Sequence, residues 1–139
     1  MCLRIRDHDP QRTPYVTKRP IVVWKSLEVF YEEGEPYYMS PIYRARYTLG
    51  ELATAELTFN SLHNVAGGLH AYVDSVRRFV GTRTFPAVIP VGARVFFGRA
   101  IARDIVSDKL IVYQDWAALL AAYPGARDHS PEPTAAFVE

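Results

Sequence analysis

Arginine and aromatic residues lie side by side in three segments of this sequence that have a β-type pattern. These segments are Tyr43–Tyr47, Gly68–Tyr72 and Ile89–Arg99. The planar guanidinium group of arginine binds phosphates and carboxylates through a fork of donors, and it also stacks on rings. Aromatic faces bind bases and other flat groups. The combination favours a protein that binds an anionic, ring-bearing ligand such as a nucleotide.

Two arginines in the first segment have a spacing that suits phosphate binding. Arg44 and Arg46 are expected on one face of a strand, about 7 Å apart by the rise of a β-strand. Such a spacing suits two phosphates or one bridged pyrophosphate. The alternative is that both arginines pair with Glu51, Glu56 or solvent, and the sequence leaves both interpretations open.

In the third segment, strand alternation predicts two faces that each combine an arginine with a ring. Arg94 and Phe96 share one face, and Phe97 and Arg99 share the other. One of the two phenylalanines is expected in the core. The other is expected to be either a stacking platform for a base or a contact between subunits.

His70 and Tyr72 share a face of the strand predicted over residues 69–73. The histidine has three open interpretations: a general base, a wall against which a base stacks, or a half-buried side chain bonded to the backbone. Ser107 and Lys109 also share a face. Lys109 is a candidate for binding a phosphate or a ribose hydroxyl, and the alternative is the polar outer face of an edge strand.

Several kinds of chemistry are not indicated. No nucleophile elbow, P-loop, zinc-protease motif or dinucleotide fingerprint is present in the sequence. Imidazole ligands must meet at bonding distance to hold a metal, and the four histidines are scattered: His8, His63, His70 and His129. We therefore expect a binding protein that is not an enzyme, with no metal site, no catalytic residues and no cofactor.

Composition limits the class of protein further. The 139 residues suit one domain, and 49% hydrophobic content supplies a core without disulfides. A net charge of +1 is too small for a groove that follows a nucleic-acid backbone. Cys2 is the only cysteine, which favours a reducing compartment. With no apolar leader and no membrane-length apolar run, the expected location is the cytoplasm.

These residues must be positioned by short strands. A strand with apolar residues on both faces is predicted over Ile21–Tyr31, and a helix is predicted over 115–123, capped by Asp115 and stopped by Pro124. A second, short helix is predicted over 74–80, and the last strand is predicted over Asp104–Gln114. The predicted fold class is α+β, with about six or seven short, mostly antiparallel strands and two helices. The predicted organisation is an arm over 1–20, one domain over 21–125 and a flexible tail over 126–139.

Six segments together resemble a group of small phage-encoded proteins, and they span most of the chain expected to be ordered. The segments are Met1–Leu3, Ile21–Leu27, Ser40–Gly50, Gly68–Tyr72, Ile89–Gly98 and Ile105–Val112. This group is similar to the first-described Thoeris anti-defence family. Members of that family sequester cyclic ADP-ribose isomers, and some also sequester cyclic oligonucleotides of the CBASS defence systems, without cleaving them.

The resemblance implies an anti-defence protein that sequesters a cyclic nucleotide signal in the host cytosol, as a homo-oligomer. A sequestering protein needs phosphate donors, stacking rings and a rigid scaffold, but no nucleophile or metal. One alternative is an accessory phage protein that binds and inhibits a host protein. Another is an enzyme that degrades a nucleotide with His70 as its base.

Overall fold

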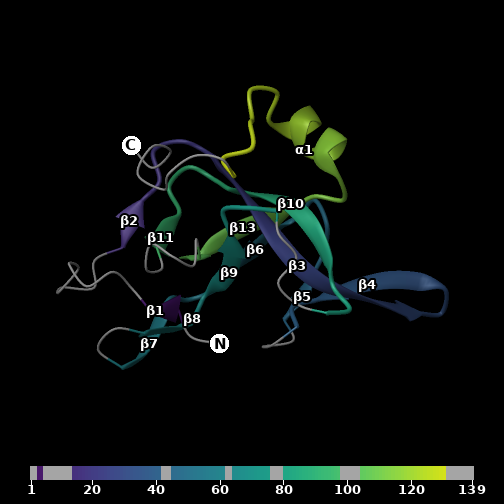
Figure 1. The fold of residues 1–139 in the computed structure, drawn as a ribbon, viewed down its shortest axis with the longest axis horizontal. Coiled ribbons are helices and arrows are strands. Elements are labelled where there is room, and N and C mark those ends of the chain that lie inside the picture. Colours follow the sequence, from purple (N-terminus) through teal and green to yellow (C-terminus); the bar gives the residue numbers. More distant parts are fainter. Residues whose placement is uncertain are drawn as a thin grey trace.

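The computed structural model describes residues 3–4, 14–41, 45–61, 64–75, 80–97 and 104–130. These residues form an α+β fold of mostly antiparallel sheet, which confirms the predicted class (Figure 1). The described ranges contain more and shorter strands than predicted, and one helix, α1 (Trp116–Ala122). The strands are β1 (Leu3–Arg4), β2 (Tyr15–Val16), β3 (Ile21–Glu32), β4 (Glu35–Met39), β5 (Arg46–Tyr47), β6 (Leu52–Thr54), β7 (Thr58–Ser61), β8 (Asn64–Gly67), β9 (Leu69–Tyr72), β10 (Arg83–Ile89), β11 (Arg94–Phe97), β12 (Asp104–Ser107) and β13 (Lys109–Val112).

Strand β3 is the centre of the main sheet, as its two apolar faces predict. Neighbouring strands in this sheet follow the order β2-β11-β12-β9-β3-β10-β13-β6. Strand β3 pairs with β10 along the whole length of β10, from Arg83 opposite Leu27 to Ile89 opposite Ile21. Beyond Leu27 it continues with β4 as a hairpin that projects from the body (Figure 1).

A sharp bend at Asp108 curls the main sheet. The single strand predicted over 104–114 is wrong, because β12 pairs with β9 and β11 whereas β13 pairs with β10 and β6. The side chain of Ser107 stabilises the bend: its Oγ donates to the Lys109 carbonyl at 2.7 Å and accepts from the Lys109 N–H at 3.1 Å. Ser107 is fully buried, so its hydroxyl does not belong to a polar outer face.

The hydrophobic core lies inside the curled sheet. Alternate residues of β3, including Ile21, Val23 and Leu27, point into it together with Phe85 of β10 and Ile105 of β12. The opposite face of β3 and β10 is also apolar. There Val22 and Val88 pack under Leu119 of α1, which explains why this strand is hydrophobic on both faces.

Helix α1 begins and ends where its sequence signals predict. The Asp115 carboxylate accepts a hydrogen bond from the Ala118 N–H at 2.8 Å and caps the first turn. The helix lies over one side of the main sheet beside β10, and the small sheet β1-β8-β7 lies away from it (Figure 1). The other helix predicted, over 74–80, falls largely on residues 76–79, which lie outside the described residues.

The segments predicted as an arm and a tail both contain residues that contact the body of the domain. Strand β2, from the segment predicted as an arm, pairs with β11. The Thr17 hydroxyl donates to the Pro90 carbonyl at 2.6 Å and accepts from the Ala93 N–H at 3.0 Å. At the other end, within the range predicted as a tail, Asp128 accepts a hydrogen bond from the Trp24 indole. Across the described ranges, α1 is too short to cross a membrane.

Candidate functional site

A pocket of about 430 Å³ lies between the outer face of the main sheet and the chain that follows α1. Its residues come from three parts of the sequence: the end of the arm, strands β3 and β10, and the last turn of α1 with the segment after it. The lining residues are Arg19, Pro20, Val22, Val88, Ala122, Tyr123, Pro124, Gly125, Ala126, Arg127 and His129. We call this the Arg19 pocket.

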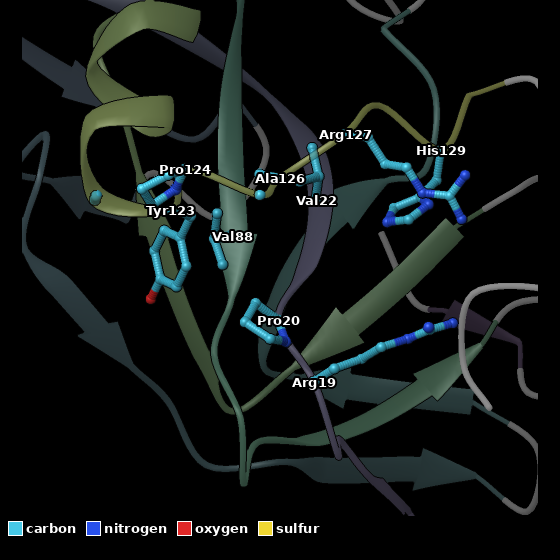
Figure 2. Close-up of a pocket in the computed structure, with 11 residues that line it drawn as sticks. Arg19, Pro20, Val22, Val88, Tyr123, Pro124, Ala126, Arg127 and His129 are labelled. Atoms are coloured by element: carbon cyan, nitrogen blue, oxygen red, sulfur yellow. The ribbon is translucent and has the colours of Figure 1, made fainter.

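The Arg19 pocket has a cationic side and an apolar side. Figure 2 shows Arg19, Arg127 and His129 on one side and Tyr123 on the other, with Val88 between them. The floor is apolar, because it is formed by Val22 and Val88, which pack between the sheet and the helix. Such an arrangement suits a ligand that is flat or apolar at one end and anionic at the other.

A short segment, residues 126–130, forms one wall of the pocket, and Asp128 holds it in place. One carboxylate oxygen, Oδ1, accepts from the Trp24 indole N–H at 3.1 Å and from the backbone and hydroxyl of Ser130 at 2.9 and 2.6 Å. Trp24 in turn stacks on Trp116 of α1, with ring centroids 5.9 Å apart. Burial raises the pKa of Asp128, but the hydrogen bonds from Ser130 and Trp24 outweigh it, so the pKa lies below its ordinary value.

The residues predicted to bind ligand do not converge on one site. Arg44 and Arg99 lie outside the described residues. Arg46 stacks over the Tyr37 ring on the exposed hairpin, 4.6 Å from its centroid. Lys109 is half-buried and pairs with Thr54 of β6 at the bend. These positions lie on separate parts of the sheet.

The two phenylalanines lie on opposite faces of β11, as predicted. Phe97 packs against the main core and against Tyr15, with ring centroids 6.3 Å apart. Phe96 is more deeply buried, at 4% exposure, but on the other face. Together with Arg94 it lines a second pocket of about 320 Å³. Arg94 and Phe96 are therefore the sequence candidates that the structure brings together.

His70 and Tyr72 share one face of β9, as the alternation predicts, and the structure places that face opposite the core with both side chains half-buried. Burial, and then the positive charge of Lys25, lower the pKa of His70 to about 4. A histidine with this pKa is neutral at pH 7 and is a weak general base there. Its Nε2 atom is buried and has no hydrogen-bond partner among the described residues, although other atoms of His70 do interact.

Lys25 is a buried amine that the search for site residues missed. Its ammonium group donates to the His70 carbonyl and lies 5.3 Å from the centroid of the Tyr47 ring. Burial lowers the pKa of Lys25 to about 8 and raises that of Tyr47 above its usual range. The signal for it in the sequence is the alternation of the strand, which places Lys25 on the same face as Ile21, Val23 and Leu27.

Arg19, Arg127 and His129 of the Arg19 pocket were not predicted as site residues, because composition assigns their segments to an arm and a tail. The available signals were Arg19 next to Pro20 at the start of a strand, and Arg127 and His129 directly after the stop of a helix. No protein-family model matches this sequence, and no curated protein or solved structure is significantly similar to it. Among the described residues, no cluster of three potential metal ligands occurs.

Proposed function

We propose that this protein binds a small anionic, ring-bearing ligand in the Arg19 pocket and retains it without cleaving it. The ligand class that combines both features is a cyclic nucleotide signal, such as a cyclic ADP-ribose isomer or a cyclic oligonucleotide. In that role the protein is a phage-type anti-defence factor that acts by sequestration, as a homo-oligomer.

The observation that carries this proposal is the arrangement of two arginines and a histidine opposite a tyrosine, over an apolar floor. A volume of about 430 Å³ lies in the range of small-molecule sites. Charge-assisted hydrogen bonds to phosphate are worth roughly 1.5–3 kcal/mol each. Arg19, Arg127 and His129 also have interactions within the protein, so a ligand exchanges those contacts for stronger ones to phosphate.

The composition of the lining favours retention over cleavage. The residues that line the pocket include no serine, cysteine, aspartate or glutamate, the usual nucleophiles and acids of phosphate and glycoside chemistry. Asp128 lies between the lining residues Arg127 and His129 in the sequence, but its carboxylate is engaged by hydrogen bonds from Trp24 and Ser130. His129 is the remaining candidate base, and it has no carboxylate partner among the lining residues.

The first test is a thermal-shift screen against cyclic ADP-ribose isomers and cyclic di- and trinucleotides, followed by mass spectrometry of the ligand released on heating. We expect stabilisation by at least one of them and release of the intact molecule. Arg19→Ala and Arg127→Ala should each weaken binding about 10- to 100-fold. Lys18→Ala is the matched control, because Lys18 is exposed beside Arg19 and does not line the pocket.

Three results would contradict the proposal: no stabilisation by any nucleotide, a chemically altered ligand after release, or full affinity in both arginine variants. Altered ligand would favour the degrading enzyme. In that case His129→Gln and His70→Gln, compared side by side, would show which histidine acts as the base.

A protein-binding role is a second candidate, and the β3–β4 hairpin favours it. Tyr31 near its tip is 71% exposed, and the hairpin projects from the body (Figure 1). An exposed aromatic side chain on a rigid projection is typical of an interface anchor. If the protein binds no nucleotide and a host protein co-purifies with it, Tyr31→Ser should abolish the co-purification while leaving the melting temperature unchanged.

A further inference from the structure

The second pocket, of about 320 Å³, is built from residues that the Arg19 pocket does not share. It is lined by Pro14, by the segment Ala55–Leu57 after β6, by Arg94 and Phe96 of β11, and by Asp108 at the bend between β12 and β13. We call it the Arg94 pocket. Its apolar part consists of Phe96, which is buried, and Leu57, which is half-buried.

The Arg94 pocket carries charges of both signs. Arg94 and Glu56 are exposed, and Asp108 is half-buried. The backbone fixes Asp108: its Oδ1 accepts from the Arg94 N–H at 2.9 Å, its own N–H donates to the Arg94 carbonyl at 3.1 Å, and its carbonyl accepts from the Ala55 N–H at 3.0 Å. The carboxylate is thus held at the pocket independently of any ligand.

These opposite charges do not neutralise one another. In the part of the chain that the structure describes, the Arg94 guanidinium group makes no ion pair or hydrogen bond, and neither does the Glu56 carboxylate. An ion pair between such exposed groups would contribute only about 0–1 kcal/mol. Both groups are therefore available to a ligand at little cost.

From this arrangement we propose that the Arg94 pocket binds a zwitterion, a small molecule that has both a carboxylate and a cationic amine or guanidine. Arg94 binds the carboxylate, because a guanidinium group and a carboxylate match in a planar, two-bond geometry. Glu56 and Asp108 bind the cationic group. Leu57 and the Phe96 ring contact the aliphatic chain between the two charges. A ligand with one charge alone would leave an opposite charge of the pocket unmatched.

The test uses L-arginine as the probe, with agmatine, which lacks the carboxylate, and valerate, which lacks the cation. Isothermal titration of the full-length protein should show that L-arginine binds about tenfold more tightly than either analogue, because it alone engages both sets of charges. In the Arg94→Gln variant, L-arginine should bind no more tightly than agmatine. In the Glu56→Gln variant, agmatine and L-arginine should both weaken while valerate is unchanged.

A merely structural role of Arg94 or Glu56 would lower the melting temperature without changing the order of the three probes. The proposal is overturned if wild-type protein binds L-arginine and agmatine equally, if no probe saturates at millimolar concentration, or if Arg94→Gln keeps the preference for L-arginine. Arg19→Ala is the control, because it changes the other pocket and should leave all three affinities unaltered. The outcome is therefore independent of whether the Arg19 pocket binds a nucleotide.

Discussion

A lysine on the core face of the central strand should make this protein more stable at alkaline pH than at neutral pH. Lys25 is buried, at 6% exposure, and its pKa falls from 10.5 to about 8. The unfolded chain binds a proton more strongly than the folded one between these values, so the charged lysine destabilises the fold below pH 8. This cost is roughly 3 kcal/mol at pH 7, and it is relieved as pH rises from about 8 towards 10.5.

We therefore predict that the free energy of unfolding of wild-type protein rises between pH 7 and pH 9.5, relative to a Lys25→Met variant. The methionine cannot titrate, and it is close to the lysine stem in volume. Urea denaturation across this range measures the difference. Exposed Lys18→Met is the control and should follow the wild type. A constant difference between wild type and Lys25→Met would show that the amine keeps its ordinary pKa.

His70 should make the stability of the folded protein sensitive to acidic pH. Its folded pKa of about 4 lies below the unfolded value of 6.5, so the unfolded chain binds more protons between them. Stability should then be full above pH 6.5 and fall as pH drops towards 4. In a His70→Gln variant this part of the acid sensitivity should disappear, measured as the change in melting temperature from pH 7 to pH 4.5. Equal acid sensitivity of both proteins would contradict the lowered pKa.

At the scale of the element, helix α1 depends on its cap more than a longer helix would. It has seven residues, too few to be stable by helix propensity alone. Asp115→Ala removes the hydrogen bond to the Ala118 N–H and should cost about 1 kcal/mol. Asp115→Ser keeps a capping oxygen and should cost a few tenths. Denaturant unfolding of the three proteins gives both values, and equal losses would indicate that the cap does not hold the helix.

Elements with a local signal could be predicted from the sequence, and elements defined by contacts could not. Strand β3 follows from a long segment that is mostly apolar on both faces, and α1 follows from a cap, an apolar stripe and a Pro124 stop. The bend at Asp108 has only a weak local signal, the polar run Ser107-Asp108-Lys109 between two apolar runs, and residues 104–114 were therefore predicted as one strand. The bend becomes visible only through the partners of β12 and β13 and the buried hydroxyl of Ser107.

The candidate sites also divide into one that a local sequence pattern predicts and one that only long-range contacts define. Alternation alone places Arg94 and Phe96 on one face of β11, and the structure brings them to one pocket. The Arg19 pocket joins residues from near the two ends of the sequence, and no periodicity in a single sequence reports such a contact. Segments rich in proline and charge were read as an arm and a tail because their composition predicts loops.

At the scale of the whole molecule, a single glycine forms one of the connections between the two sheets. Gly68 lies between β8 of the small sheet and β9 of the main sheet, with φ +130°. A methyl group on it would lie 2.6 Å from Cγ2 of Val106 and 2.8 Å from Cδ2 of Leu57. Val106 belongs to β12 of the main sheet and Leu57 to the segment that leads into β7 of the small sheet, so the close packing at this junction requires the absence of a side chain.

We predict that Gly68→Ala destabilises the protein by more than about 2 kcal/mol, the sum of an unfavourable φ and a clash with Val106 and Leu57. Gly34→Ala separates the two causes. Gly34 in the hairpin turn also has a positive φ, +81°, but nothing lies within 4 Å of its added methyl group. It should cost only about 1 kcal/mol. If chemical denaturation gives both variants the same loss, the sheets do not pack tightly at Gly68. A larger loss at Gly68, together with faster amide exchange in β7 and β8 than in β3 and β10, would show that the small sheet depends on this contact for its place on the fold.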